Sequence, residues 1–398
     1  MHRLAFLAAI AVATPARAVT CDQLPNPIYL QVGDTQLNLM KRLGRALRDN
    51  ANKPITLVFI TSGSCVNIQE IYHQTAPITS NMQYVPSMGE DPNWQPTSPT
   101  LLCTPPANLF PDIGNSALSN SACTMESPPA NVHLTNGPTQ AYVLATPKAS
   151  TQTAITFEEA YFVFGFGPTI LAQMQGSISP WLDEMSLAIR GPTKSTLLAW
   201  AANLTISPVS KFHGVVPMGD SSPGVVAALQ NATNPEAAIG LLGAEVYDAN
   251  RSTLNILAFR SHHQYAAYYP DSTSTSRDKK NVRDGHYTVW SPTIWMDYID
   301  GQGNPTKPDA RYVIDLIAGH DVMPIPNFDA QTIVARVGLV PDCAMRVQRG
   351  FEGGPLSFYT PATSCTCKYE SIVDASSCDT CTTSCAIGVC RGGYCEEF

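Results

Sequence analysis

Charged side chains are scarce in this sequence. They make up only 14% of the 398 residues, and the 24 basic residues are outnumbered by 32 acidic ones. Such a chain lacks the positive surface by which proteins bind nucleic acid or anionic membranes, so neither is expected as a partner. Beyond residue 18 no apolar run is long enough for a transmembrane helix, and no repeat recurs at a fixed period.

Catalytic motifs are also missing. There is no G-x-S-x-G nucleophile elbow, and no H-E-x-x-H spacing accompanies His262, His263 and His286. We expect the adjacent histidines to lie in a strand and to point to opposite faces, so at most one could join His286 at a metal. Residues 219–224 resemble the GDSGG loop of serine proteases, but Ser222-Pro223 is explained as a helix start. The sequence therefore predicts no enzyme, no metal and no cofactor.

The first 18 residues have the pattern of a secretory signal peptide. A short basic start precedes the apolar stretch Leu4 to Ala13, and Ala16-Arg17-Ala18 is an A-x-A cleavage site. Thr20 before Cys21 fits a lipobox poorly, so a soluble protein of the periplasm or extracellular space is expected rather than a lipoprotein. Removing Arg3 and Arg17 with the leader leaves 22 basic against 32 acidic residues, a net charge of −10.

All twelve cysteines follow this leader. An even number of cysteines in an exported chain predicts disulfides. Eight of them fall in residues 343–398, which we expect to form a small tail that needs such staples because it cannot bury a core of its own. The C-x-x-C spacing in the tail also suits zinc, although the tail contains no histidine. The cysteines are Cys21, Cys65, Cys103, Cys123, Cys343, Cys365, Cys367, Cys378, Cys381, Cys385, Cys390 and Cys395.

The N-terminal half reads twice as strand, small polar loop and helix. Ile28 to Val32 is a predicted strand, with Asp34 or Thr35 as the N-cap of a helix whose apolar face is Leu37, Met40, Leu43 and Leu47. Pro54 to Tyr72 repeats the order through Gly63 and Ser64. Backbone N–H groups at such helix starts suit an anion or a ligand oxygen. Asp112 to Ser116 is a candidate third loop.

The later part of the chain continues in the same style. Thr156 and Glu159 form a T-x-x-E capping box, and Met185 to Ile189 is a predicted strand that leads through Arg190 to a helix at Leu197 to Asn203. Leu254 to Arg260 is a predicted strand that carries the chain back to the first domain. Because the mature chain is too long for one compact core, we expect two α/β domains.

The order of these segments resembles the type II periplasmic solute-binding proteins, in particular the phosphate receptors of ABC transporters. The resemblance covers about residues 26–260. It is carried by residues 28–35, Gly63-Ser64, residues 155–159, Ile189-Arg190 with Ser195-Thr196, residues 223–228 and residues 238–240.

This resemblance implies a two-lobed α/β fold that closes on a solute. Residues 19–146 and 256–342 would form the first lobe, and residues 147–255 the second. Thr35 and Ser64 would face Arg190, Ser195 and Thr196 across a cleft and hold a small anionic or polar ligand. The implied protein is a monomer whose partner could be the membrane component of a transporter.

The sequence departs from the phosphate receptors at two places. Lys194 stands where the receptors have a serine and Ser195 where they have a glycine, and Ala117 follows the third loop where they have an aspartate.

Other roles also fit the predicted site residues: Thr35 and Ser64 as helix caps, Arg190 as a partner of Asp183 or Glu184. A disulfide from Cys65, with Cys21 as one candidate, would stiffen the loop at Gly63 and Ser64. The alternative function is a scaffold that keeps the fold for protein contact.

Overall fold

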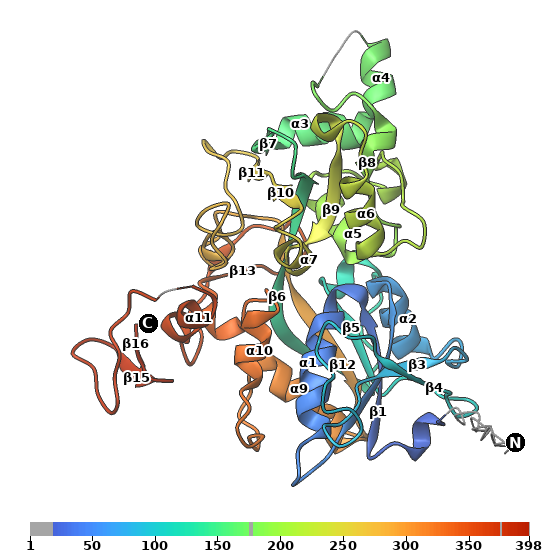
Figure 1. The fold of residues 1–398 in the computed structure, drawn as a ribbon, viewed down its shortest axis with the longest axis vertical. Coiled ribbons are helices and arrows are strands. Elements are labelled where there is room, and N and C mark those ends of the chain that lie inside the picture. The colour runs from blue at the N-terminus through green and yellow to red at the C-terminus, as the bar shows by residue number, and fades with distance from the viewer. Residues whose placement is uncertain (1–18, 175–177, 375, 398) are drawn as a thin grey trace, which may run out of the picture.

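One mixed β-sheet runs through both lobes of the molecule (Figure 1). The computed structural model describes residues 19–174, 178–374 and 376–397, so the predicted leader lies outside the described residues. The sheet has ten strands: nine follow the order β4-β3-β2-β1-β5-β12-β6-β9-β8, and β10 pairs with β6 on the edge opposite β9. In this part of the chain no helix has the length and apolarity needed to cross a membrane.

The first lobe combines parallel and antiparallel strands with helices on both faces. Strands β1, β2 and β5 are parallel, and β12 runs antiparallel to β5. The strands are β1 (Pro27–Gly33), β2 (Thr56–Ser62), β3 (Met82–Tyr84), β4 (Leu101–Cys103), β5 (Ile113–Ser116), β6 (Val132–Pro147) and β12 (Trp290–Tyr298). The helices are α1 (Leu37–Arg48), α2 (Ser64–His73), α9 (Pro308–Ala318) and α10 (Ala330–Arg336).

Alternation along β1 divides the core of this lobe. Ile28, Leu30 and Val32 are fully buried in one cluster with the apolar residues of α1 and α9, whereas Tyr29 belongs to a second cluster. Successive side chains of a strand point to opposite faces, so β1 supplies both layers. The predicted apolar face of α1 is confirmed, since Met40, Leu43 and Leu47 are buried there.

The second lobe is built on the other half of β6. Residues 142–145 of β6 pair with β9 (Ile239–Gly243), which is flanked by β8 (Leu187–Ala188). The remaining elements are β7 (Ala154–Thr156), α3 (Phe157–Tyr161), the π-turn Phe162–Phe166, α4 (Pro168–Gln173), α5 (Ser195–Asn203), α6 (Ser222–Gln230), α7 (Ala244–Ala249), β10 (Leu254–Ile256) and β11 (Ala258–Arg260). The capping box of Thr156 and Glu159 is confirmed at the start of α3.

The predicted strand over residues 254–260 is two short strands. β10 pairs with β6, but β11 pairs in parallel with β7 of the second lobe. The chain therefore stays beside the second lobe past residue 256, and β12 is the strand that re-enters the first. We propose that the chain returns to the first lobe near residue 290, where β12 begins, rather than at residue 256.

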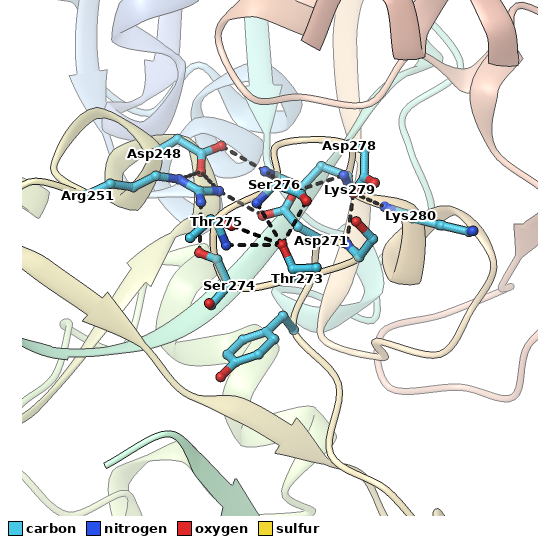
Figure 2. A network of polar contacts seen from close by, with 12 residues as sticks. Asp248, Arg251, Asp271, Thr273, Ser274, Thr275, Ser276, Asp278, Lys279 and Lys280 are labelled. Atoms are coloured by element: carbon cyan, nitrogen blue, oxygen red, sulfur yellow. Dashed lines mark hydrogen bonds and ion pairs between the residues drawn. The ribbon is translucent and has the colours of Figure 1, made fainter. Parts of the chain in front are cut away.

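The segment between β11 and β12, which includes the short helix α8 (Lys280–Arg283), is anchored by a buried ion network that Figure 2 shows. The ammonium of Lys279 contacts Asp248 (2.8 Å) and Asp271 (2.9 Å). Arg251 contacts the same two carboxylates at 2.6 and 2.8 Å. Two cations and two anions thus alternate, and Lys279 is fully buried.

The cysteine-rich tail packs against the body of the protein. Its helix α11 (Thr366–Val373) buries Tyr369 in the large core cluster of the second lobe. The guanidinium of Arg283 lies over the Tyr369 ring at 5.2 Å and donates to Glu370 (2.9 Å) and to the carbonyl of Ala344 (3.0 Å). Two short hairpins, β13 (Val347–Gln348) with β14 (Ser357–Phe358) and β15 (Val389–Arg391) with β16 (Tyr394–Glu396), complete this region.

All twelve cysteines form disulfides, as the even count predicts. The eight tail cysteines pair among themselves. The suggested Cys65–Cys21 bond is wrong, because the 3-10 turn Asn120–Ala122, directly before Cys123, packs against α2, where Asn120 donates to the Tyr72 hydroxyl (3.0 Å). The pairs are Cys21–Cys103, Cys65–Cys123, Cys343–Cys365, Cys367–Cys378, Cys381–Cys390 and Cys385–Cys395. Six disulfides indicate that the chain folds in an oxidising compartment.

Candidate functional site

The start of α2 in the first lobe touches the loop before α5 in the second. The N–H of Cys65 donates to the carbonyl of Thr193 at 3.3 Å. A Cβ built on Gly63 would lie 2.7 Å from both oxygens of Thr193, so only glycine allows this approach. The loops that sequence analysis assigned to opposite sides of a site are therefore in direct contact.

A chain of polar contacts connects Ser64 to Ser195. The Ser64 hydroxyl accepts from the N–H of Ala117 (3.1 Å), and the carbonyl of Ala117 accepts from the Tyr142 hydroxyl. The same hydroxyl contacts Ser195 in the second lobe. Burial strongly raises the pKa of Tyr142, so its phenol stays neutral and acts as a hydrogen-bond donor. Tyr142 lies on the strand that the two lobes share.

Thr35 and Thr196 are both buried at helix starts. Thr35 lies in the 3-10 turn η2 (Asp34–Gln36) between β1 and α1, and Thr196 is the second residue of α5. Neither Asp34 nor Thr35 caps α1, so the predicted cap is wrong: a turn of 3-10 helix intervenes, and the N-cap residue is Gln36. The Asp34 side chain instead reaches the second lobe.

Arg190 is fully buried, and acidic groups surround it. Its Nε donates to a carboxylate oxygen of Asp220 (3.1 Å), and Nη2 donates to the Asp220 carbonyl (2.8 Å) and to Asp34 Oδ2 (3.0 Å). Nη1 donates to the Ser222 hydroxyl (3.0 Å). The sequence alternative, pairing with Asp183 or Glu184, is wrong. Asp183 caps a 3-10 turn, and Glu184 pairs with His213.

Sequence analysis missed Asp34 as a contact of Arg190, and it missed Asp220 and Ser222. Asp34 lies almost directly after the predicted strand, and this place could have indicated a site residue. The resemblance instead implied its neighbour Thr35. The sequence presents residues 219–224 as a protease-like loop and as a helix start at Ser222-Pro223, and neither interpretation predicts a contact with Arg190. In the structure Ser221 caps α6 by accepting from the N–H of Gly224 (3.2 Å), and Ser222 faces Arg190.

Several buried polar atoms near Thr35 lack a hydrogen-bond partner within the described chain. The Gln36 amide donates to Gln140 (2.7 Å), which leaves the oxygen of Gln36 and the amide nitrogen of Gln140 without one. The side-chain oxygen of Asn115 is also unpaired. All three residues are fully buried. Because an unpaired buried polar group costs about 1–3 kcal/mol, these three atoms are hydrogen-bonding capacity that the described chain leaves unused beside Thr35.

The predicted third loop is a strand. Residues 113–116 form β5, held between β1 and β12, and Asn115 and Ser116 are buried there. Asp112 precedes it and pairs with Lys307 (2.7 Å), away from Arg190. This third segment therefore contributes the Asn115 side chain and the following Ala117 backbone rather than a ligand-binding loop.

Among the described residues, His262, His263 and His286 do not come together in a group with metal-ligand spacing. His262 and His263 lie in a turn rather than a strand, so their rings meet at 3.8 Å instead of pointing apart. The sulfurs of Cys381, Cys385 and Cys395 lie within 4.8 Å of one another. They are close because the disulfides Cys381–Cys390 and Cys385–Cys395 are neighbours. The C-x-x-C cysteines, Cys378 and Cys381, are bonded to Cys367 and Cys390, so neither offers a thiolate to zinc.

Glu245 introduces a pH dependence beside this junction. Burial of its carboxyl, with the charge of Asp34 adding, raises its pKa to about 8. The folded state then holds a proton that the unfolded state releases above a pKa of about 4.3. We expect the free energy of unfolding to fall as the pH rises from about 5 to 8, by at most ~1.4 kcal/mol per pH unit.

Chemical denaturation of Glu245→Gln across pH 5–8 tests this expectation. The variant should be less dependent on pH than the wild type, whereas Glu397→Gln, at an exposed position, should follow the wild type. An unchanged slope in Glu245→Gln would show that the carboxyl is not protonated in the folded protein.

Comparison with known proteins places the fold. No protein-family model matches the sequence, and neither does any curated protein. The putative phosphate ABC transporter substrate-binding protein from Clostridium perfringens, solved with bound phosphate, is similar in structure with a TM-score of 0.51 and 12% identity; the match covers 79% of this chain and 99% of that one. An ABC-type phosphate transport receptor from Vibrio cholerae gives a TM-score of 0.46 at 12% identity over 79% and 99% of the two chains. At this identity the likeness concerns architecture alone: the chain has the two-lobed type II periplasmic-binding-protein fold, extended by a disulfide-rich tail.

Proposed function

We propose that the protein is an exported solute-binding protein, without enzymatic activity, that captures a small polar solute between its two lobes. Thr35 and Ser64 of the first lobe and Arg190, Ser195 and Thr196 of the second would hold the solute. The observation that supports the proposal is the contact between the lobes beside these buried residues, where Cys65 meets Thr193 and Arg190 meets Asp34. The membrane component of an ABC transporter is the partner that this function implies.

Charge at the junction bears on the kind of solute. Arg190 is balanced by Asp34 and Asp220, so the cluster carries one positive and two negative charges. An anion would have to enter against this excess, whereas an uncharged polar solute would not. The unpaired amide groups of Gln36, Gln140 and Asn115 offer both donors and acceptors to such a solute.

In this structure the lobes are closed on each other, so a solute needs them to part. Hinge closure around ligands is the usual motion of two-lobed binding proteins. β6 passes from one lobe to the other near Ala141 and Tyr142, and β12 returns at Trp290. These crossings are where bending would separate the Gly63 loop from Thr193.

Thermal unfolding of the mature protein against a panel of uncharged polar solutes and oxyanions tests the proposal. A solute present at about 100 times its dissociation constant should stabilise the protein by roughly 2.7 kcal/mol, which appears as a clear rise of the unfolding temperature. Thr35→Val and Thr196→Val remove one hydroxyl from each lobe with little change of shape, and both should reduce the rise.

Thr56→Val is the matched control. Thr56 is equally buried, but it lies at the opposite end of β2 and donates to the carbonyl of Pro25 (2.7 Å). This variant should lose stability yet keep the full response to the solute. A panel without any stabilising solute would count against the proposal.

The second candidate function is a scaffold that retains the fold for protein contact. The self-contained pairing of Arg190 with Asp34 and Asp220 favours it, because the arginine's charge is already satisfied. Under this alternative no solute stabilises the protein, and Thr35→Val and Thr196→Val affect stability alone.

A further inference from the structure

One oxygen of Asp34 has the surroundings of a bound oxyanion oxygen. Asp34 Oδ2 accepts from Arg190 Nη2 (3.0 Å), from the Ser222 N–H (3.1 Å) and from the Ser222 hydroxyl (3.2 Å). Guanidinium, helix N-terminal N–H and hydroxyl are the groups that bind phosphate-like oxygens in proteins. Here all three are directed at a side chain of the same protein.

These contacts cross between the lobes. Asp34 belongs to the turn after β1 in the first lobe, while Arg190, Ser222 and the nine-residue helix α6 belong to the second. The carboxylate is therefore an interlobe tie as well as a partner for Arg190. Its side chain is 19% exposed, whereas that of Arg190 is fully buried. The exposed edge of Asp34 is the side from which a competing group could reach Arg190.

Asp220 plays a different part around the same arginine. It comes from the loop before α6 in the same lobe as Arg190, and one carboxylate oxygen also accepts from the Gly191 N–H (2.9 Å). It therefore fixes the arginine within its lobe and remains when the lobes separate. Asp34 is the carboxylate that separation would remove.

We propose that Asp34 is an internal ligand of this site, whose carboxylate holds the place of an incoming oxyanion oxygen and so makes the wild-type site select uncharged polar solutes over oxyanions. The inference deepens the proposed function and rests on it only in taking the interlobe junction as the solute site. An oxyanion has to displace Asp34. The free energy needed to break the Asp34 contacts lowers the affinity with which the oxyanion binds. Asparagine keeps the shape of the side chain but removes the charge.

Titration calorimetry of Asp34→Asn with inorganic phosphate and with sulfate tests this selection. A charge-assisted hydrogen bond contributes about 1.5–3 kcal/mol, so the variant should bind an oxyanion roughly 10- to 100-fold more tightly than the wild type. Small-angle X-ray scattering of the solute-free variant should give a larger radius of gyration, because the tie between the lobes is weakened. Asp34→Ser provides a second variant should the first fold poorly.

Asp112→Asn is the matched control. Asp112 is also an aspartate of the first lobe, with a side chain 23% exposed, but it pairs with Lys307 inside that lobe. This variant should match the wild type in oxyanion affinity and in scattering. Oxyanion binding by the wild type as tight as by Asp34→Asn would overturn the inference, as would folded Asp34 variants that gain no oxyanion affinity.

The two proposals fail in different ways. If Asp34→Asn gains oxyanion affinity while no uncharged solute stabilises the wild type, Asp34 stands as an internal ligand that excludes oxyanions, whereas the capture of a polar solute and the preference for an uncharged one both fail. If an uncharged solute binds the wild type but Asp34→Asn gains nothing, the proposed function stands and the inference is overturned.

Discussion

Replacing Lys279 with methionine is expected to lower the free energy of unfolding by about 3–5 kcal/mol, because it leaves buried carboxylates without one of their two cations. Burial alone would lower the pKa of Lys279, but Asp248 and Asp271 outweigh burial and raise it, so the ammonium stays charged. With Lys279 gone, Arg251 alone would have to balance both carboxylates (Figure 2).

Urea denaturation of Lys279→Met beside Lys280→Met measures this loss. Lys280 is the next residue in the chain but is exposed, so its variant should stay within about 0.5 kcal/mol of the wild type. Adding Asp271→Asn to Lys279→Met should recover part of the stability, since it removes the excess negative charge. A loss below 1 kcal/mol in Lys279→Met would mean that the network contributes little to folding.

Removing the Cys21–Cys103 disulfide is expected to cost about 3–5 kcal/mol. The bond joins two cysteines 82 residues apart and ties the start of the described chain to β4, with both sulfurs in a buried cluster. Closing a long loop restricts the unfolded chain more than closing a short one, so this bond should stabilise more than those of the tail.

The double variant Cys381→Ser with Cys390→Ser supplies the comparison. That pair closes only 9 residues, so its removal should cost roughly 2 kcal/mol less by the same loop argument. Both double variants leave no unpaired thiol, and denaturant titration under oxidising conditions compares them directly. Equal losses, or a greater loss for the tail pair, would contradict the loop argument.

Local patterns in the sequence predicted local structure well. The capping box of Thr156 and Glu159 is present, because it depends on residues three apart in the chain. The apolar spacing of Leu37, Met40, Leu43 and Leu47 likewise predicted α1, and residues 28–32 predicted β1. The two-lobed fold followed from the order of such segments, and the structural likeness to a substrate-binding protein confirms it.

Long-range partners could not be predicted in the same way. Asp34 and Arg190 are 156 residues apart. From the sequence Asp34 is equally well explained as a helix cap, and Arg190 as the partner of an acidic residue nearby in the chain, so their ion pair could not be predicted. Residues 112–116 were predicted to be a loop because Asp, Gly, Asn and Ser lack strand propensity, yet pairing with β1 and β12 makes residues 113–116 a buried strand. Tertiary contacts decided both cases.

The central claim is that one small polar solute is held by residues of both lobes. A double-mutant cycle of solute affinity with Thr35→Val, Thr196→Val and their combination tests it most directly, using the solute that raises the unfolding temperature most. Each single variant should weaken binding, and the two losses should be non-additive because both hydroxyls contact the same clamped solute. The account would be contradicted if only one of the two single variants lost affinity for the solute, or if both single variants bound it as tightly as the wild type.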